Sequence, residues 1–176
     1  KRDRPYVPPH EFNGDFPHLM LRARAQEFKN GKVSFPEKQM TKTDRNGRIG
    51  CSVSGLVNWA CKCSNKVTRP VMEAAAGIHR DAKLPAFVPK TLTDRAKAAS
   101  LEINTDAPAF GRKAVLYATC FGNYNNPAIG EAAIKVLTKN GVETQIVHPR
   151  CCGMPQLEHG DIEAVAESAK ATAGDL

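Results

Sequence analysis

Residues 113–147 contain two short apolar runs separated by an amphipathic segment, and this pattern constrains the fold more strongly than any other feature of the chain. The runs at 113–118 and 142–147 have the length and apolar character of buried β-strands. Helical spacing follows each run, first from Pro127 and later over about 161–171. The order strand, helix, strand, helix predicts an α/β unit of parallel strands joined by a right-handed crossover.

The helix that begins at Pro127 is expected to bury one apolar face. That face comprises Ile129, Ala132, Ala133, Val136 and Leu137. Glu131 and Lys135 stand four residues apart on the other face, where opposite charges attract each other. The turn-rich stretch at 120–126, before this helix, is expected to be a loop.

The first 110 residues are expected to form a mostly helical and irregular segment, followed by a second unit at 111–176. A proline-rich run at 5–10 is expected to be extended. After it, Asp15 is expected to cap a helix that ends near Gly31. The apolar stripe of this helix comprises Phe16, Leu19, Met20, Ala23 and Phe28.

The middle of the N-terminal segment has weaker signals. Residues 38–47 are polar and include the turn-forming pair Asn46-Gly47, so they are expected to form a loop. Residues 49–60 combine helical spacing with glycines and β-branched side chains, and a helix is one interpretation of them. Further helices are expected at 69–76 and near 93–102, the second within a proline-containing linker.

The composition is that of a globular protein, with 41% hydrophobic and 24% charged residues. No run approaches the roughly 18 apolar residues of a membrane-spanning helix. Residues 1–100 hold 19 Lys and Arg against 9 Asp and Glu, a net charge of +10 within a total of +7. Because these cations are scattered and few aromatic residues lie among them, the pattern disfavours nucleic-acid binding. It favours an acidic partner protein or a phospholipid surface.

Six cysteines in 176 residues indicate metal binding or redox chemistry rather than a disulfide scaffold. No secretory signal precedes them, and the first residue is Lys1, so we expect the chain to begin inside a longer reading frame. The expected location is cytoplasmic, at the inner face of the cytoplasmic membrane if the basic residues contact lipid.

Three cysteines follow the two predicted strands. Cys120 follows the first strand, and the adjacent pair Cys151 and Cys152 follows the second. Since the carboxyl ends of parallel strands share one edge of a sheet, we expect the three thiols in a single site. Gly153 would let the backbone turn closely around that site. Soft thiolates bind iron–sulfur clusters, zinc or Cu(I), and the spacing alone leaves these open, together with buried core thiols.

The segments Tyr117-Ala-Thr-Cys-Phe-Gly-Asn-Tyr-Asn-Asn-Pro127 and Cys151-Cys-Gly-Met-Pro155 resemble the CCG cysteine-rich domain. That domain occurs in heterodisulfide reductase B subunits, glycolate oxidase iron–sulfur subunits and anaerobic glycerol-3-phosphate dehydrogenase C subunits. The N-terminal half is similar to the C-subunit group in particular, at residues 5–12, 15–23 and 77–82.

The resemblance implies a subunit that carries electrons through a [4Fe–4S] cluster, from a flavoprotein dehydrogenase subunit toward an acceptor such as quinone. It also implies Cys120, Cys151 and Cys152 as cluster ligands within one βαβα half of a CCG domain. The ferredoxin module and the second CCG repeat of the family are missing from this sequence, and so are the later cysteines of the motif. The alternative function is a zinc-stabilised interaction module without redox activity.

The remaining candidates have simpler interpretations. Cys51, Cys61 and Cys63 are expected to be incidental thiols, with an additional metal or redox site as the alternative. The five histidines are dispersed, and we expect each to be hydrogen-bonded or exposed. His148 and Arg150, next to the cysteine pair, could tune the site through their charge. Tyr124 and Asn125 could line a pocket or serve the turn. A basic face on the first helix comprises Arg22, Arg24, Lys29 and Lys32.

Overall fold

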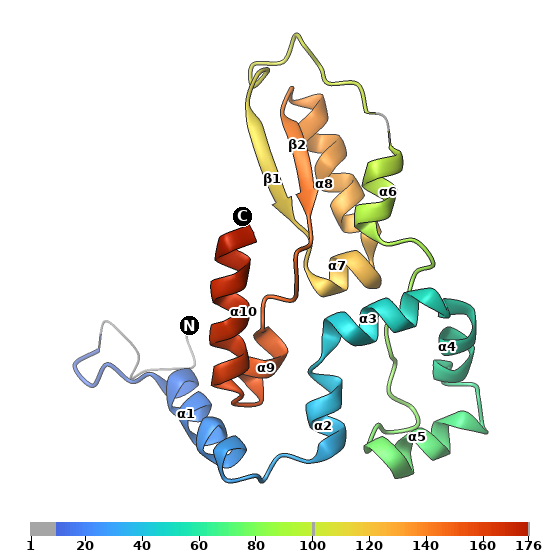
Figure 1. Ribbon diagram of the computed structural model, residues 1–176, viewed down its shortest axis with the longest axis vertical. Coiled ribbons are helices and arrows are strands. Elements are labelled where there is room, and N and C mark those ends of the chain that lie inside the picture. The colour runs from blue at the N-terminus through green and yellow to red at the C-terminus, as the bar shows by residue number, and fades with distance from the viewer. Residues whose placement is uncertain (1–9, 100, 176) are drawn as a thin grey trace.

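The computed structural model describes residues 10–99 and 101–175, so the predicted extended run at 5–10 lies outside them except for His10. The described N-terminal part is helical (Figure 1). Its helices are α1 (Phe16–Lys29), α2 (Phe35–Met40), α3 (Thr43–Ser52), α4 (Ser54–Cys61), α5 (Thr68–Ala76) and α6 (Leu92–Ala98). None of the described helices is both long and apolar enough to cross a bilayer.

The second part of the chain is the predicted α/β unit. It consists of β1 (Lys113–Tyr117), α7 (Cys120–Tyr124), α8 (Pro127–Lys139), β2 (Glu143–Val147), α9 (Met154–Glu158) and α10 (Ile162–Asp175). The two strands are parallel, and Lys113 pairs with Glu143 while Tyr117 pairs with Val147. The prediction of an α/β fold with parallel strands after a helical, irregular segment is therefore confirmed.

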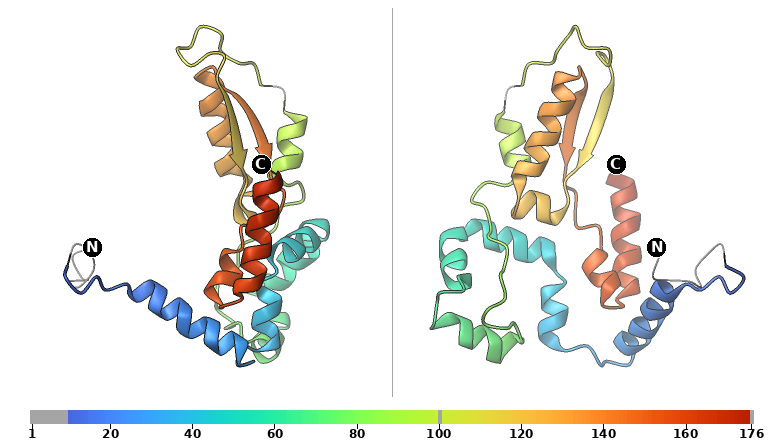
Figure 2. Two further views of the ribbon diagram at one scale, coloured as in Figure 1. Left: turned by 60° about the vertical axis from the view of Figure 1, so that its left-hand side comes forward. Right: turned by 180° about the vertical axis from the view of Figure 1, so that it is seen from behind.

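A small core joins α6 to the α/β unit. Leu92, which is only 1% exposed, packs with Ala118 and Ile134. Helices α8 and α6 both contact β2, whereas most of α10 lies below the ends of the strands in Figure 1, as the views of Figure 2 also show. Gly130 of α8 permits the close approach of α6, because a side chain at this position would collide with Leu92.

The predicted buried face of α8 is wrong at three of its positions. Ile129, Ala132 and Val136 are exposed, and the helix instead buries Pro127, Gly130, Ile134 and Thr138. The reason is that α6 and β2 lie against this second face and exclude water from it. Glu131 forms its ion pair with Arg95 of α6 at 3.2 Å.

The predicted loop at 38–47 is also wrong for most of its length, because 38–40 belong to α2 and 43–47 to α3, and only 41–42 connect them. Ser34 and Glu37 form a capping box that begins α2. Asn46-Gly47 lies within α3 and forms no turn. Gly47 is buried against the Tyr124 ring, which a side chain at position 47 would strike. Close packing explains this glycine, and no turn is needed to account for it.

Helix α1 confirms its predicted cap but not its predicted apolar stripe. The Asp15 carboxylate accepts a hydrogen bond from the His18 amide. Of the predicted stripe, Phe16, Leu19 and Met20 are exposed. The helix is attached to the second part of the chain through Arg24, whose guanidinium donates to the Glu158 carbonyl at 2.6 Å.

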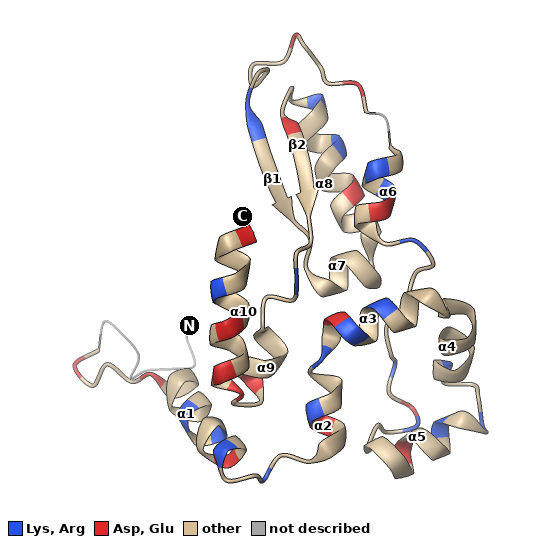
Figure 3. Ribbon diagram, viewed as in Figure 1, with Lys and Arg blue, Asp and Glu red and all other residues tan. Residues whose placement is uncertain are grey.

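The charged residues are scattered over the structure, as the sequence pattern indicates. Lys and Arg are spread over several helices among acidic residues, without forming one continuous stripe (Figure 3). Helix α5 ends at Ala76, as the predicted range 69–76 requires, and Gly77 follows it in the left-handed conformation. Inside it, Arg69 is only 1% exposed and donates hydrogen bonds to the carbonyls of His79, Arg80 and Ala82. This buried cation fixes the loop that follows α5.

Candidate metal centre

Cys120 is the first residue of α7, directly beyond the end of β1. The side chain of Thr119 caps this helix by accepting a hydrogen bond from the Gly122 amide at 3.2 Å. The prediction of a loop over 120–126 is therefore wrong for 120–124, because a capped helical turn satisfies the backbone there. Cys120 itself is partly buried.

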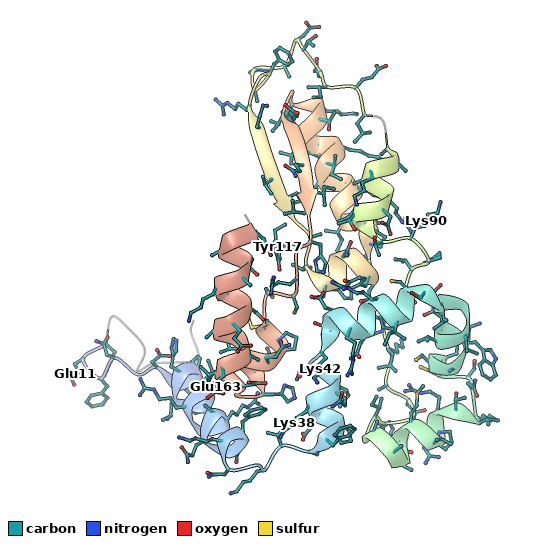
Figure 4. The ribbon with its side chains drawn as sticks, viewed as in Figure 1. Glu11, Lys38, Lys42, Lys90, Tyr117 and Glu163 are labelled. Atoms are coloured by element: carbon teal, nitrogen blue, oxygen red, sulfur yellow. The ribbon has the colours of Figure 1, made fainter. Side chains whose placement is uncertain are left out.

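The Cys151-Cys152 pair lies in the connection between β2 and α9. The Tyr117 hydroxyl, at the end of β1 and labelled in Figure 4, donates to the carbonyl of Arg150 and so attaches this connection to the first strand. Gly153 has a φ of +86°, a conformation that favours glycine. Its amide donates to the Cys151 sulfur at 3.5 Å. Cys151 is buried and Cys152 is exposed.

The two strand ends bring Cys120 and Cys151 together, as the parallel arrangement predicts. The Thr43 hydroxyl lies 3.4 Å from the Cys120 sulfur and 3.1 Å from the Cys151 sulfur. Both cysteines and Cys152 line one cavity of about 410 Å³. Its other walls are mainly apolar and include Met40, Phe87, Phe121 and Pro155. The cavity thus combines cysteine side chains with mainly apolar surroundings.

The Cys120 and Cys151 thiols are coupled to each other. A hydrogen bond from the Cys120 thiol stabilises the Cys151 thiolate and lowers the pKa of Cys151 to about 5. The same hydrogen bond, together with burial, raises the pKa of Cys120. Because the two thiols are coupled, the hydrogen bond favours loss of the first proton from Cys151, and the thiolate is the form of cysteine that binds metals.

Asp44 of α3 connects several parts of this site. One carboxylate oxygen accepts hydrogen bonds from His148 Nε2 at 2.8 Å and from the Tyr124 hydroxyl at 3.3 Å. The other accepts from the backbone amide of Cys151 at 2.5 Å. Burial raises the pKa of Asp44, but the hydrogen bonds from His148 and Cys151 outweigh it and lower the pKa to about 2.

His148 is held between two acceptors. Its Nε2 faces the Asp44 carboxylate and its Nδ1 faces the Ala118 carbonyl. Two acceptor oxygens, one beside each ring nitrogen, favour the protonated imidazole, in which both nitrogens are donors. Burial lowers the pKa of His148, but the hydrogen bond to Asp44 outweighs this effect and raises it. The expectation of a hydrogen-bonded histidine is confirmed.

Residues 114–174 match the family model of the CCG cysteine-rich domain. This segment therefore resembles the CCG domain. It is also similar to the C subunits of anaerobic glycerol-3-phosphate dehydrogenase from Escherichia coli strain K12 and from Escherichia coli O157:H7. In both cases 29% of 154 residues are identical, and these cover 86% of this chain. The chain spans about 37% of the length of these two relatives. No solved structure matches it significantly.

Cys120, Cys151 and Cys152 all line the cavity, and thiolates are the ligands that iron–sulfur clusters take, usually four to a [4Fe–4S] cluster. Among the described residues, however, these three cysteines do not form a group of mutually close donor atoms. A separate grouping consists of Asp44, Cys120 and His148, whose candidate ligand atoms all lie within 4.8 Å of one another. Sulfur, nitrogen and oxygen in one place is a donor set that zinc also accepts.

The other cysteines lie outside the cavity of the CCG domain. Cys51 is buried and points at the Tyr124 carbonyl, 3.6 Å away. Cys63 is exposed and lies near the carbonyls of Asp81 and Ala82, at 4.0 and 3.7 Å. Cys61 is partly buried at the end of α4. Neither the cavity lining nor the group of neighbouring metal donors among the described residues includes these three thiols.

The sequence interpretation identified the cysteines but missed Thr43 and Asp44. Both lie in the stretch interpreted as a polar loop, 76 to 108 residues away from the groups they contact. No local pattern reveals such a relationship. Tyr124 and Asn125 do line the cavity, as one interpretation expected. Arg150 forms an ion pair with Asp175 at 3.2 Å.

Proposed function

We propose that this chain is part of an iron–sulfur electron-transfer subunit of an oxidoreductase. In this proposal Cys120, Cys151 and Cys152 are cluster ligands, and the cluster is of the [4Fe–4S] type. The dehydrogenase partner is a flavoprotein subunit, and the acceptor is a quinone at the inner face of the cytoplasmic membrane. The helical segment 1–110 and the CCG unit 111–176 act as two successive parts of this subunit.

The observation that carries the proposal is the convergence of the Cys120 and Cys151 sulfurs on one hydroxyl, inside a cavity that Cys152 also lines. The match to the CCG domain and the similarity to a glycerol-3-phosphate dehydrogenase C subunit support it. A bound iron–sulfur cluster would supply reversible one-electron transfer. The chain itself would bind it through thiolates and exclude water with apolar walls.

A zinc site is the second candidate, because Asp44, Cys120 and His148 bring an oxygen, a sulfur and a nitrogen together. Two features weigh against it. Asp44 and His148 already form a hydrogen bond with each other at 2.8 Å. In addition, the second nitrogen of His148 faces a backbone carbonyl. A metal ion would have to replace the first of these bonds.

The test is metal analysis of the protein expressed from its complete reading frame and purified without oxygen. We expect iron and acid-labile sulfide in similar amounts, a brown colour that bleaches with dithionite, and an electron paramagnetic resonance signal. Zinc in place of iron, with no sulfide, would overturn the proposal in favour of the interaction module.

A further inference from the structure

Thr43 contacts both of the partly or fully buried thiols of the proposed site. Its hydroxyl oxygen lies 3.4 Å from the sulfur of Cys120 and 3.1 Å from that of Cys151. Both separations are within the range of hydrogen bonds to sulfur. A hydroxyl carries a single hydrogen, so it donates to one sulfur at a time, and the shorter distance favours Cys151.

The position of Thr43 depends on the protein around it. It is the first residue of α3, which packs against α7 and crosses below the end of the sheet (Figure 1). The following residue, Asp44, accepts hydrogen bonds from Cys151, His148 and Tyr124. One turn later, Gly47 packs on the Tyr124 ring. These contacts hold the hydroxyl at the sulfurs independently of a metal ion.

A hydrogen bond to a ligand sulfur stabilises the more negatively charged state of an iron–sulfur cluster. Reduction adds one electron, while the donor keeps its proton, so the added negative charge strengthens the bond. Hydrogen bonds to the sulfurs are accordingly among the factors that set cluster potentials. The Gly153 amide is a second donor to Cys151, at 3.5 Å, but it belongs to the backbone. Thr43 is a side-chain donor that a substitution can remove.

We infer that Thr43 is a positioning residue that raises the reduction potential of the cluster held by Cys120 and Cys151. This inference rests on the proposed function and goes beyond it. It assigns control of the potential to a helix outside the CCG domain. The hydroxyl group raises the potential. The size and the methyl group of the side chain do not.

Three variants separate the hydroxyl from the other properties of the side chain. Thr43→Val removes the hydroxyl and keeps the shape, whereas Thr43→Ser keeps the hydroxyl. The matched control is Thr41→Val, since Thr41 is buried and its hydroxyl donates to the Lys38 carbonyl at 2.9 Å, away from the sulfurs. Each protein is purified without oxygen from the complete reading frame. Iron and sulfide are measured before the midpoint potential, which is determined by dithionite titration with electron paramagnetic resonance.

We expect all three variants to contain the parent amount of iron and sulfide. The Thr43→Val midpoint should be more negative than that of the parent, while those of Thr43→Ser and Thr41→Val stay at the parent value. If Thr43→Val contains the parent amount of iron and sulfide and has the parent midpoint potential, the inference is wrong while the proposed function stands. The inference is also wrong if the midpoint potential of Thr43→Ser shifts as far as that of Thr43→Val, or if Thr43→Val loses its iron. A parent protein without iron and sulfide overturns the proposed function as well.

Discussion

The carboxylate of Asp44 accepts a hydrogen bond of 2.5 Å from the backbone amide of Cys151, although 107 residues separate the two in the sequence. A side chain of the helical segment therefore fixes the backbone of a proposed ligand in the CCG domain. The bond is charge-assisted, and such bonds are roughly twice as strong as neutral ones. The metal-free protein is thus expected to hold this loop in place before any metal binds.

Replacing Asp44 with Ala should reduce both stability and metal content. The substitution leaves the Cys151 amide and the His148 ring without their acceptor, and an unsatisfied buried donor costs about 1–3 kcal/mol. We expect the free energy of unfolding to fall by this amount and iron content to fall with it, as measured by urea denaturation and metal analysis. The matched control is Asp81→Ala, because the Asp81 side chain is 81% exposed. Equal effects of the two substitutions would refute the positioning role of Asp44.

Cysteine replacements in matched pairs should distinguish ligands from incidental thiols. Cys151 and Cys51 are both buried, and Cys152 and Cys63 are both exposed. Changing Cys151 or Cys152 to Ala should abolish iron binding, whereas changing Cys51 or Cys63 should leave it unchanged and alter stability by no more than about 1 kcal/mol. Iron content and electron paramagnetic resonance measure the difference. Our site assignment is wrong if Cys63→Ala loses as much iron as Cys152→Ala.

The contact between Leu92 and α8 should dominate the stability of the small core. Leu92→Ala removes a side chain that is only 1% exposed, and such a change typically costs about 2–5 kcal/mol. Leu56→Ala is the control, because Leu56 is 66% exposed and surface substitutions usually stay within about 0.5 kcal/mol. Urea denaturation of both variants provides the comparison, and similar midpoints would show that α6 contributes little.

Alkylation of the metal-free protein should begin at a higher pH for Cys51 and Cys61 than for an unfolded thiol. Burial raises the pKa of both side chains in the folded protein. Because the thiolate is the reactive form, a raised pKa lowers the rate around pH 8 and moves the rise in rate to higher pH. Iodoacetamide labelling followed by mass spectrometry gives the rate at each cysteine. In urea, Cys51 and Cys61 should react at the rate of an ordinary unfolded thiol. If their rates around pH 8 are the same in the folded protein as in urea, this prediction is wrong.

Local patterns predicted the α/β unit because its signals lie within each element. The apolar runs at 113–118 and 142–147 and the proline at 127 all act over a few residues. The parallel pairing then follows from the general handedness of such units. For the same reason the meeting of Cys120 with Cys151 could be anticipated, since it depends only on the order of the strands.

Long-range packing determined what local patterns could not predict. The sequence of α8 allows two apolar faces, and the arrival of Leu92 at Gly130 decides which one is buried. Asn46-Gly47 has the composition of a turn, yet the Tyr124 ring requires a glycine within a helix at this position. Thr43 and Asp44 are ordinary helix-starting residues until the fold places them beside the sulfurs.

The packing of α3 on α7 has a consequence for recombination between homologous proteins. A chimera that joins the helical segment of one relative to the CCG domain of another would separate Asp44 from His148, and Gly47 from Tyr124. The helical segment and the second unit would then come from different proteins, and their contacting surfaces would not match. Exchange at a boundary near residue 110 should therefore succeed only when the other protein supplies matching residues at these positions. The residues that must be kept together therefore include part of the helical segment, beyond the segment that carries the proposed cysteine ligands.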